Sequence, residues 1–125
     1  MSIYPTFHFR DARAAIDFLE RAFGFERKAV YDADDGTVQH AEMRLGDGIV
    51  MFGDTKDTEF AKLAPPPGSA SVYVAVDDVD ALHERAKAAG AEIVYGPKDQ
   101  HYGSRDFTAR DLEGNLWSFG TYRPT

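Results

Sequence analysis

The chain contains two copies of one short pattern, and this duplication restricts the possible folds more than any other feature. In each copy an aspartate suited to capping a helix, Asp11 or Asp78, precedes a stretch with apolar residues at helical spacing. A glycine, Gly24 or Gly90, follows at the position where helices often end in the left-handed conformation. The aspartates are 67 residues apart and the glycines 66. We therefore predict two similar modules in tandem.

Segments with strand composition surround each predicted helix. One segment precedes the helix and three follow it, the last two being joined by a tight turn. The predicted strands are 4–10, 26–32, 37–45 and 48–53 in the first half and 71–76, 91–96, 104–110 and 115–120 in the second. Each module is thus a strand, a helix and three strands, which makes the fold class α+β.

The length and composition limit the domain organisation and the partners. A chain of 125 residues is long enough for one domain. We expect module one at about 1–53, a proline-containing linker at 54–70 and module two at 71–125. A net charge of −7 argues against nucleic acid. Without an apolar run long enough to span a bilayer, a leader-like start or any cysteine, we expect a cytoplasmic protein that does not bind membranes.

Four segments together resemble the vicinal oxygen chelate superfamily, which includes glyoxalase I, extradiol dioxygenases, and the bleomycin and fosfomycin resistance proteins. The segments are DARAAIDFLERAFGFE, HAEMRLGDGIVMFGD, VAVDDVDALHERAKAAGAEI and YGSRDFTARDLEGNLWSFGTY. The resemblance implies that the two modules form a curved mixed sheet cup with the helices outside, and that the protein is a homodimer. None of the segments is a catalytic signature, so the resemblance is specific for the fold and not for an activity.

The resemblance also allows a test for a metal site. Metal-dependent members place four His, Glu or Gln ligands in the cup, from the first and last strand of each module. The corresponding positions are Tyr4, Ser71, Ser118, and either Met51 or Phe52. None of these is the carboxylate or imidazole that such a cation prefers. The resemblance therefore implies a member without a metal or other cofactor.

Strand alternation independently predicts which residues line the cup. Residues such as Trp117 and Phe119 should pack beneath the helices, so that Ser118 between them faces the opposite way. A polar sheet face can simply contact solvent, but tyrosines among polar groups favour a pocket for a small molecule. The residues predicted to face the cup are Tyr4, Thr6, His8, His40, Glu42, Ser71, Tyr73 and Ser118.

A glycine-containing loop at 99–107 is a further candidate. His101, Tyr102 and Arg105 lie there, where members of this family often contact the bound molecule. A loop with a flexible glycine can close over a ligand, although it can equally be an ordinary surface loop.

These features predict a protein that binds a small organic molecule and sequesters an antibiotic or metabolite without a metal, as in the bleomycin-resistance branch. Glu42 would then anchor a cationic ligand. The predicted ligand-binding residues are Tyr4, His8, His40, Glu42, Met51, Ser71, Tyr73, Tyr102, Arg105 and Ser118.

Two alternatives remain open. A glyoxalase-like lyase or isomerase would need an unconventional metal on His8, His40 and Glu42, or metal-free proton transfer. In the second case Glu42 or His40 would be the base, and Tyr73 or Tyr4 the acid. A module that only joins subunits would instead lack a pocket.

Overall fold

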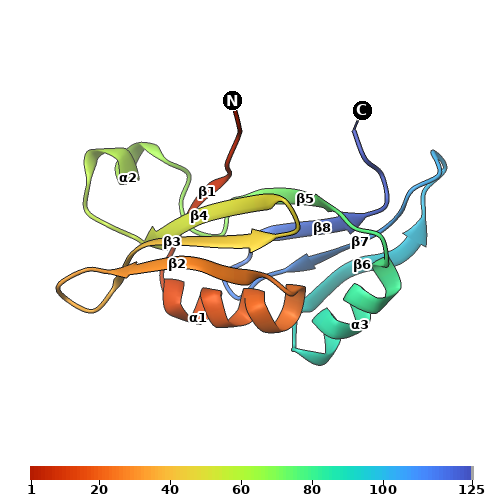
Figure 1. Cartoon of the computed structure of the whole chain (residues 1–125), viewed down its shortest axis with the longest axis horizontal. Helices are drawn as coiled ribbons and strands as arrows, with labels where there is room; N and C mark the ends of the chain where they lie inside the picture. The colour runs from red at the N-terminus through yellow and green to blue at the C-terminus, as the bar shows by residue number, and fades with distance from the viewer. Residues whose placement is uncertain (125) are drawn as a thin grey trace.

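The computed structural model describes residues 1–124 and contains two four-stranded mixed sheets (Figure 1). The first sheet has the order β1 (Thr6–Phe9), β4 (Gly48–Asp54), β3 (Val38–Leu45) and β2 (Glu26–Asp32). The second repeats this order with β5 (Ser71–Ala75), β8 (Leu116–Gly120), β7 (Arg105–Arg110) and β6 (Glu92–Asp99). In each sheet the first two strands are parallel and the other pairs antiparallel. The predicted α+β duplication is confirmed.

The two main helices begin as the sequence indicates. In α1 (Ala12–Phe18) and α3 (Val79–Ala88), the capping carboxylates of Asp11 and Asp78 each accept a backbone hydrogen bond of 3.0 Å from the first turn. The first helix continues as a wider turn, η1 (Leu19–Phe23), and ends at Gly24 with a φ of 80°. That left-handed conformation costs a glycine little, which explains why the helix stops there.

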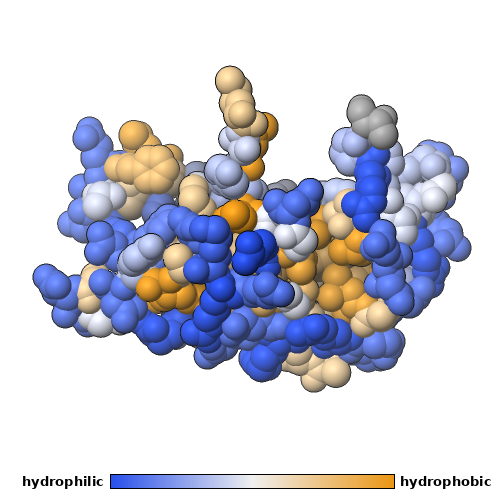
Figure 2. Space-filling view, viewed as in Figure 1, coloured by the Kyte–Doolittle hydropathy of each residue, from blue (hydrophilic) through white to orange (hydrophobic). Residues whose placement is uncertain are grey.

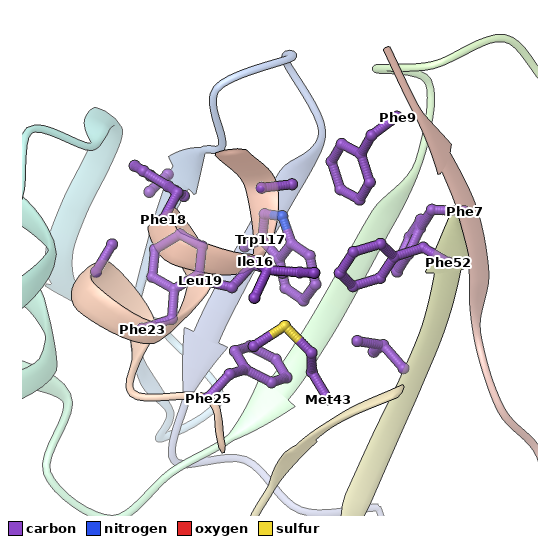
Figure 3. Packing of buried hydrophobic residues seen from close by; sticks show 14 of the residues in the cluster. Phe7, Phe9, Ile16, Phe18, Leu19, Phe23, Phe25, Met43, Phe52 and Trp117 are labelled. Atoms are coloured by element: carbon purple, nitrogen blue, oxygen red, sulfur yellow. The ribbon is translucent and has the colours of Figure 1, made fainter. Parts of the chain in front are cut away.

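Both modules contribute to a single hydrophobic core, shown in Figure 3. The ring of Trp117 in β8 lies 5.7 Å from that of Phe23 in η1 and 5.6 Å from that of Phe7 in β1, measured between centroids. Trp117 and Phe119 are fully buried, as predicted. The indole N–H is satisfied by Asp111 at 3.0 Å. The modules therefore fold against each other within the chain.

Polar groups join the modules at both ends of the α1–η1 helix. Before its first turn, the Glu113 carboxylate accepts hydrogen bonds from the backbone N–H groups of Arg10 at 2.7 Å and Asp11 at 2.8 Å. At the other end, the Arg85 guanidinium of α3 donates to the carbonyl oxygen of Glu20 at 2.9 Å. Orphaned backbone groups of one module are thus satisfied by side chains of the other.

The helices leave one face of each sheet uncovered. α1 lies against β1, β3 and β4, whereas α3 lies against β6 and β7, and both helices are on the same side of the molecule (Figure 1). Apolar residues of alternate strand positions, such as Phe9, Met43 and Phe107, point to this side and are buried. The intervening positions face away from the helices, as the alternation predicts.

A third helix, α2 (Glu59–Leu63), lies in the segment that the sequence identified only as a linker. The Thr58 hydroxyl caps it by accepting from the N–H of Ala61 at 3.1 Å. Its apolar residues Phe60 and Leu63 are 63% and 81% exposed, and Figure 2 shows hydrophobic side chains gathered over α2. None of the helices within residues 1–124 has the length and apolarity needed to cross a membrane.

Candidate ligand-binding site

Two adjoining cavities lie on the uncovered face of the first sheet, beside α2. One of about 320 Å³ lies between β1 and the segment that follows α2, and one of about 290 Å³ extends over β3 and β4. They share Thr6, Phe7, His8 and Phe60, so we treat them as one site, the α2 cleft. Its other lining residues are Gln39, His40, Met51, Phe52, Gly53, Lys56, Leu63, Ala64, Pro65, Pro66, Gly68, Ala70 and Asn115.

The register of the sheet determines which side chains face the cleft. Thr6 of β1 pairs with Met51 of β4, which pairs with Glu42 of β3, so these three project from the same face. Phe52 projects from the opposite face and is 3% exposed. The resemblance to the family left the fourth ligand position open between Met51 and Phe52. Met51 is the one on the uncovered face.

A three-residue network lies at the edge of the cleft. His40 Nε2 is 3.0 Å from Glu42 Oε2, and Lys28 Nζ is 3.2 Å from Glu42 Oε1. The hydrogen bond from His40, with a further contribution from Lys28, holds the pKa of Glu42 below its ordinary value. Tyr31 stacks on the His40 ring with centroids 6.2 Å apart. Glu42 is thus already paired and influences the cleft through His40, since it lines neither cavity.

The histidines and Glu42 do not assemble into a metal site. Within residues 1–124, no three His, Asp or Glu side chains lie close enough together to hold a metal ion. The metal form of the glyoxalase-like alternative, which requires His8, His40 and Glu42 together, therefore has no geometric support.

The polar face of the second sheet carries a separate group of predicted residues. Ser118 pairs with Tyr73 and Thr108 in the sheet, and its Oγ is 2.7 Å from Thr108 Oγ1. The Tyr73 hydroxyl donates to the carbonyl oxygen of Tyr122 at 2.7 Å, and partial desolvation of the side chain raises the pKa of Tyr73. Ser118 therefore faces away from the core, as expected, but a neighbouring hydroxyl already engages it.

Tyr73 also lines a third cavity, of about 260 Å³, where the two modules meet. Ile3, Val72 and Arg123 are among its other lining residues. His40 and Glu42 do not line this cavity. Proton transfer between either of them and Tyr73 would therefore require an arrangement that this chain alone does not provide.

The remaining predicted residues lie apart from the cleft. The Arg105 guanidinium donates to Asp80 of α3 at 2.8 Å and to Asp99 at 3.2 Å, on the side of the sheet that the helix covers. Tyr102 is exposed and its ring packs edge-on against those of His101 and Tyr122. Tyr4 and Ser71 are exposed and line none of the three cavities.

The sequence reasoning brought forward His8, His40 and Met51 of the α2 cleft, but it missed Phe60, Leu63 and Lys56. These residues belong to the segment that was expected to be a linker. The available signal was the pair of large apolar residues Phe60 and Leu63, three positions apart in a segment expected to be a surface linker, because an exposed apolar patch often marks a binding site.

Comparison with known proteins identifies the family. The family model described as the Glyoxalase/Bleomycin resistance protein/Dioxygenase superfamily matches residues 6–119. The protein Mb0911c of Mycobacterium bovis is 33% identical over 115 residues, covering 88% of this chain and 76% of that protein.

Solved structures with the same fold agree with this match. TioX from Micromonospora sp. ML1 has a TM-score of 0.83 and 35% identity, covering 98% of this chain and 100% of that one. TnmS3, an antibiotic binding protein from Streptomyces sp. CB03234, has a TM-score of 0.73 and 24% identity, covering 95% and 94%. The chain therefore belongs to the glyoxalase/bleomycin resistance protein/dioxygenase superfamily.

Proposed function

We propose that this protein binds a small organic molecule in the α2 cleft without a metal, and that it sequesters an antibiotic or metabolite. The α2 cleft itself carries this proposal. Its two cavities combine an apolar wall, formed by α2 and the prolines after it, with a few polar groups from β1 and β3. Their combined size falls in the range of about 300–1,000 Å³ that is typical of small-molecule sites.

The family adds support of a more general kind. TnmS3 is described as an antibiotic binding protein and shares the fold. The positions that would hold the metal in metal-dependent members are Tyr4, Met51, Ser71 and Ser118, none of which is a carboxylate or imidazole. Sequestration requires no catalytic group, only a cavity of suitable size with apolar walls and a few polar groups, and the α2 cleft provides these.

Thermal melting of chelator-treated protein tests this function. A compound that binds only the native state raises the melting temperature, by an amount equivalent to about 2.7 kcal/mol at a hundredfold excess over Kd. We expect several flat aromatic compounds to do so with the native protein and with the control Leu112→Ala, whose side chain is exposed in the β7–β8 turn. Phe60→Ala should lose the effect. The proposal would be contradicted if the melting temperature rose only after a metal was added, or if no compound raised it.

The cytoplasmic location of the protein stays a prediction.

We further propose that two chains form a homodimer and that this dimer completes the predicted cup. β1 and β5 are edge strands of their sheets, so both offer unpaired backbone groups. Tyr73 of β5 is 42% exposed, and Ile3, which lines the same cavity, is 95% exposed, so a partner chain at β5 would cover both. Sedimentation should detect a dimer at micromolar concentration, and Ile3→Lys should weaken it. A monomer throughout that concentration range would refute this arrangement.

A further inference from the structure

The titratable side chains that line the α2 cleft are all basic. They are His8, His40 and Lys56, and no aspartate or glutamate belongs to the described lining of either cavity. The whole chain carries 21 acidic residues and a net charge of −7. A basic site within an acidic protein runs against the overall composition, so any attraction for an anion must arise locally.

Lys56 is the one permanently charged group of the cleft. Its Nζ donates to the carbonyl oxygen of Gln39 at 2.8 Å, which fixes the ammonium at the edge of β3. An ammonium has three N–H donors, so this bond leaves two for a ligand. Gln39 is bonded through its backbone carbonyl and brings no negative charge to Lys56, and the neighbouring Asp57 pairs with Lys62 at 3.5 Å instead.

The acidic residue at the edge of the cleft, Glu42, is already engaged. Glu42 is held by His40 and Lys28 and lies outside the lining of both cavities. Because Glu42 is a carboxylate, it accepts the hydrogen bond, and His40 must donate through Nε2. Glu42 thus orients the His40 ring instead of presenting a free negative charge to a cationic ligand.

The walls of the cleft favour a flat aromatic group. Phe60 lies edge-on to His8 with ring centroids 5.9 Å apart, and Leu63, Pro65 and Pro66 extend the apolar surface. Aromatic rings add favourable edge and stacking contacts to the burial of apolar area. The polar groups are on the β-sheet side, so a ligand would need its charged group at one end only.

We infer that the α2 cleft takes a flat aromatic molecule carrying one carboxylate or phenolate, with the anion on Lys56 and the ring against Phe60. This inference rests on the proposed function, because it names the ligand class of the same site. It replaces the expectation that Glu42 anchors a cation.

Calorimetry with three probes of equal ring size tests the inference. The probes are 2-naphthoate, 2-naphthamide and 2-naphthylmethylammonium, added to the chelator-treated full chain. We expect 2-naphthoate to bind about threefold to tenfold more tightly than the amide, as for a partly exposed ion pair, and the ammonium to bind most weakly. Higher salt should lower the affinity for 2-naphthoate and leave the affinity for the neutral amide unchanged, because salt screens the ion pair.

Two lysine variants locate the anion. Lys56→Gln should remove the preference for 2-naphthoate and leave the amide affinity within about twofold, since only the charge contact is lost. Lys87→Gln makes the same charge change on α3, where the side chain is exposed and lines neither cavity, and should keep the preference.

The possible failures separate the two proposals. Equal binding of the three probes, a preference for the ammonium, or a preference that survives in Lys56→Gln would overturn the inference. In those three cases the probes do bind. If Phe60→Ala abolished their binding, the probes would bind in the α2 cleft and the proposed function would still hold. Failure of all three probes also overturns the inference, and the melting panel with other compounds then decides the proposed function separately.

Discussion

At the scale of single residues, Gly53 shows how closely the floor of the cleft is built. A β-carbon at this position of β4 would lie 2.6 Å from the carbonyl oxygen of Gln39 in β3. Contacts this short do not occur between a β-carbon and a backbone oxygen, so only glycine allows the two strands to approach in this way.

Gly53→Ala should therefore destabilise the protein. We expect the free energy of unfolding to fall by about 1–3 kcal/mol, because the strands must move apart to accept the methyl group. Gly48→Ala is the control, since the nearest atom to a β-carbon there is the Leu45 carbonyl oxygen at 3.5 Å, an ordinary contact. Urea denaturation of both variants measures the difference, and equal stabilities would show that β3 and β4 are not so close.

The Glu42 network gives a prediction about pH. His40, and to a smaller extent Lys28, lower the pKa of Glu42 in the folded state. The associated stability is present above the ordinary pKa of 4.5 and is lost as the pH falls through the lower, folded value. In a carboxylate NMR titration, His40→Ala should raise the pKa of Glu42 more than Lys28→Ala does. An unchanged midpoint in both variants would mean that the network does not form in solution.

Residue-scale prediction from sequence succeeded where alternation within a strand decides the outcome. The alternation correctly predicted that Trp117 and Phe119 are buried and that Ser118 faces away from the core. It did not foresee that Lys28 reaches Glu42 across strands, because a register shift between Arg27 and Ala29 determines that contact. Register depends on pairing between strands, and such pairing cannot be read from one strand alone.

At the scale of elements, the helix ends were predictable because capping is local. Asp11, Asp78, Gly24 and Gly90 act at the positions indicated by sequence. The five-residue helix α2 was not predictable, since one turn has too few positions to show a period. This one omission hid Phe60 and thus one wall of the candidate site.

Glu113 offers a test of the contact between elements of different modules. Its side chain, 12% exposed, accepts hydrogen bonds from the backbone of Arg10 and Asp11 just before α1. Glu113→Ala should lower the free energy of unfolding by about 1.5–3 kcal/mol, because two backbone donors lose a charged acceptor. Glu84→Ala, at a side chain 75% exposed on α3, should change it by less than about 0.5 kcal/mol. Equal effects in calorimetric melting would argue against this link.

At the scale of the whole molecule, the duplication predicted the two sheets but not how they meet. The modules share one core on their helix-covered sides, with Phe23 of the first against Trp117 of the second. Their polar faces therefore carry separate groups of residues, His8 and His40 on one and Tyr73 and Ser118 on the other. The periodicity of a sequence identifies the face of each strand, whereas the packing of two modules depends on long-range contacts.

The chain's three methionines provide the most direct measurement of ligand binding. Met51 lines the α2 cleft, Met43 is fully buried in the core and Met1 is exposed at the start of the chain. With methyl-labelled, chelator-treated protein, an aromatic compound that raises the melting temperature should shift the Met51 methyl resonance in proportion to occupancy and leave Met43 in place. If Met51 stays unmoved while Met43 or Met1 shifts, or if Met51 shifts only after a metal is added, metal-free binding in the α2 cleft is wrong.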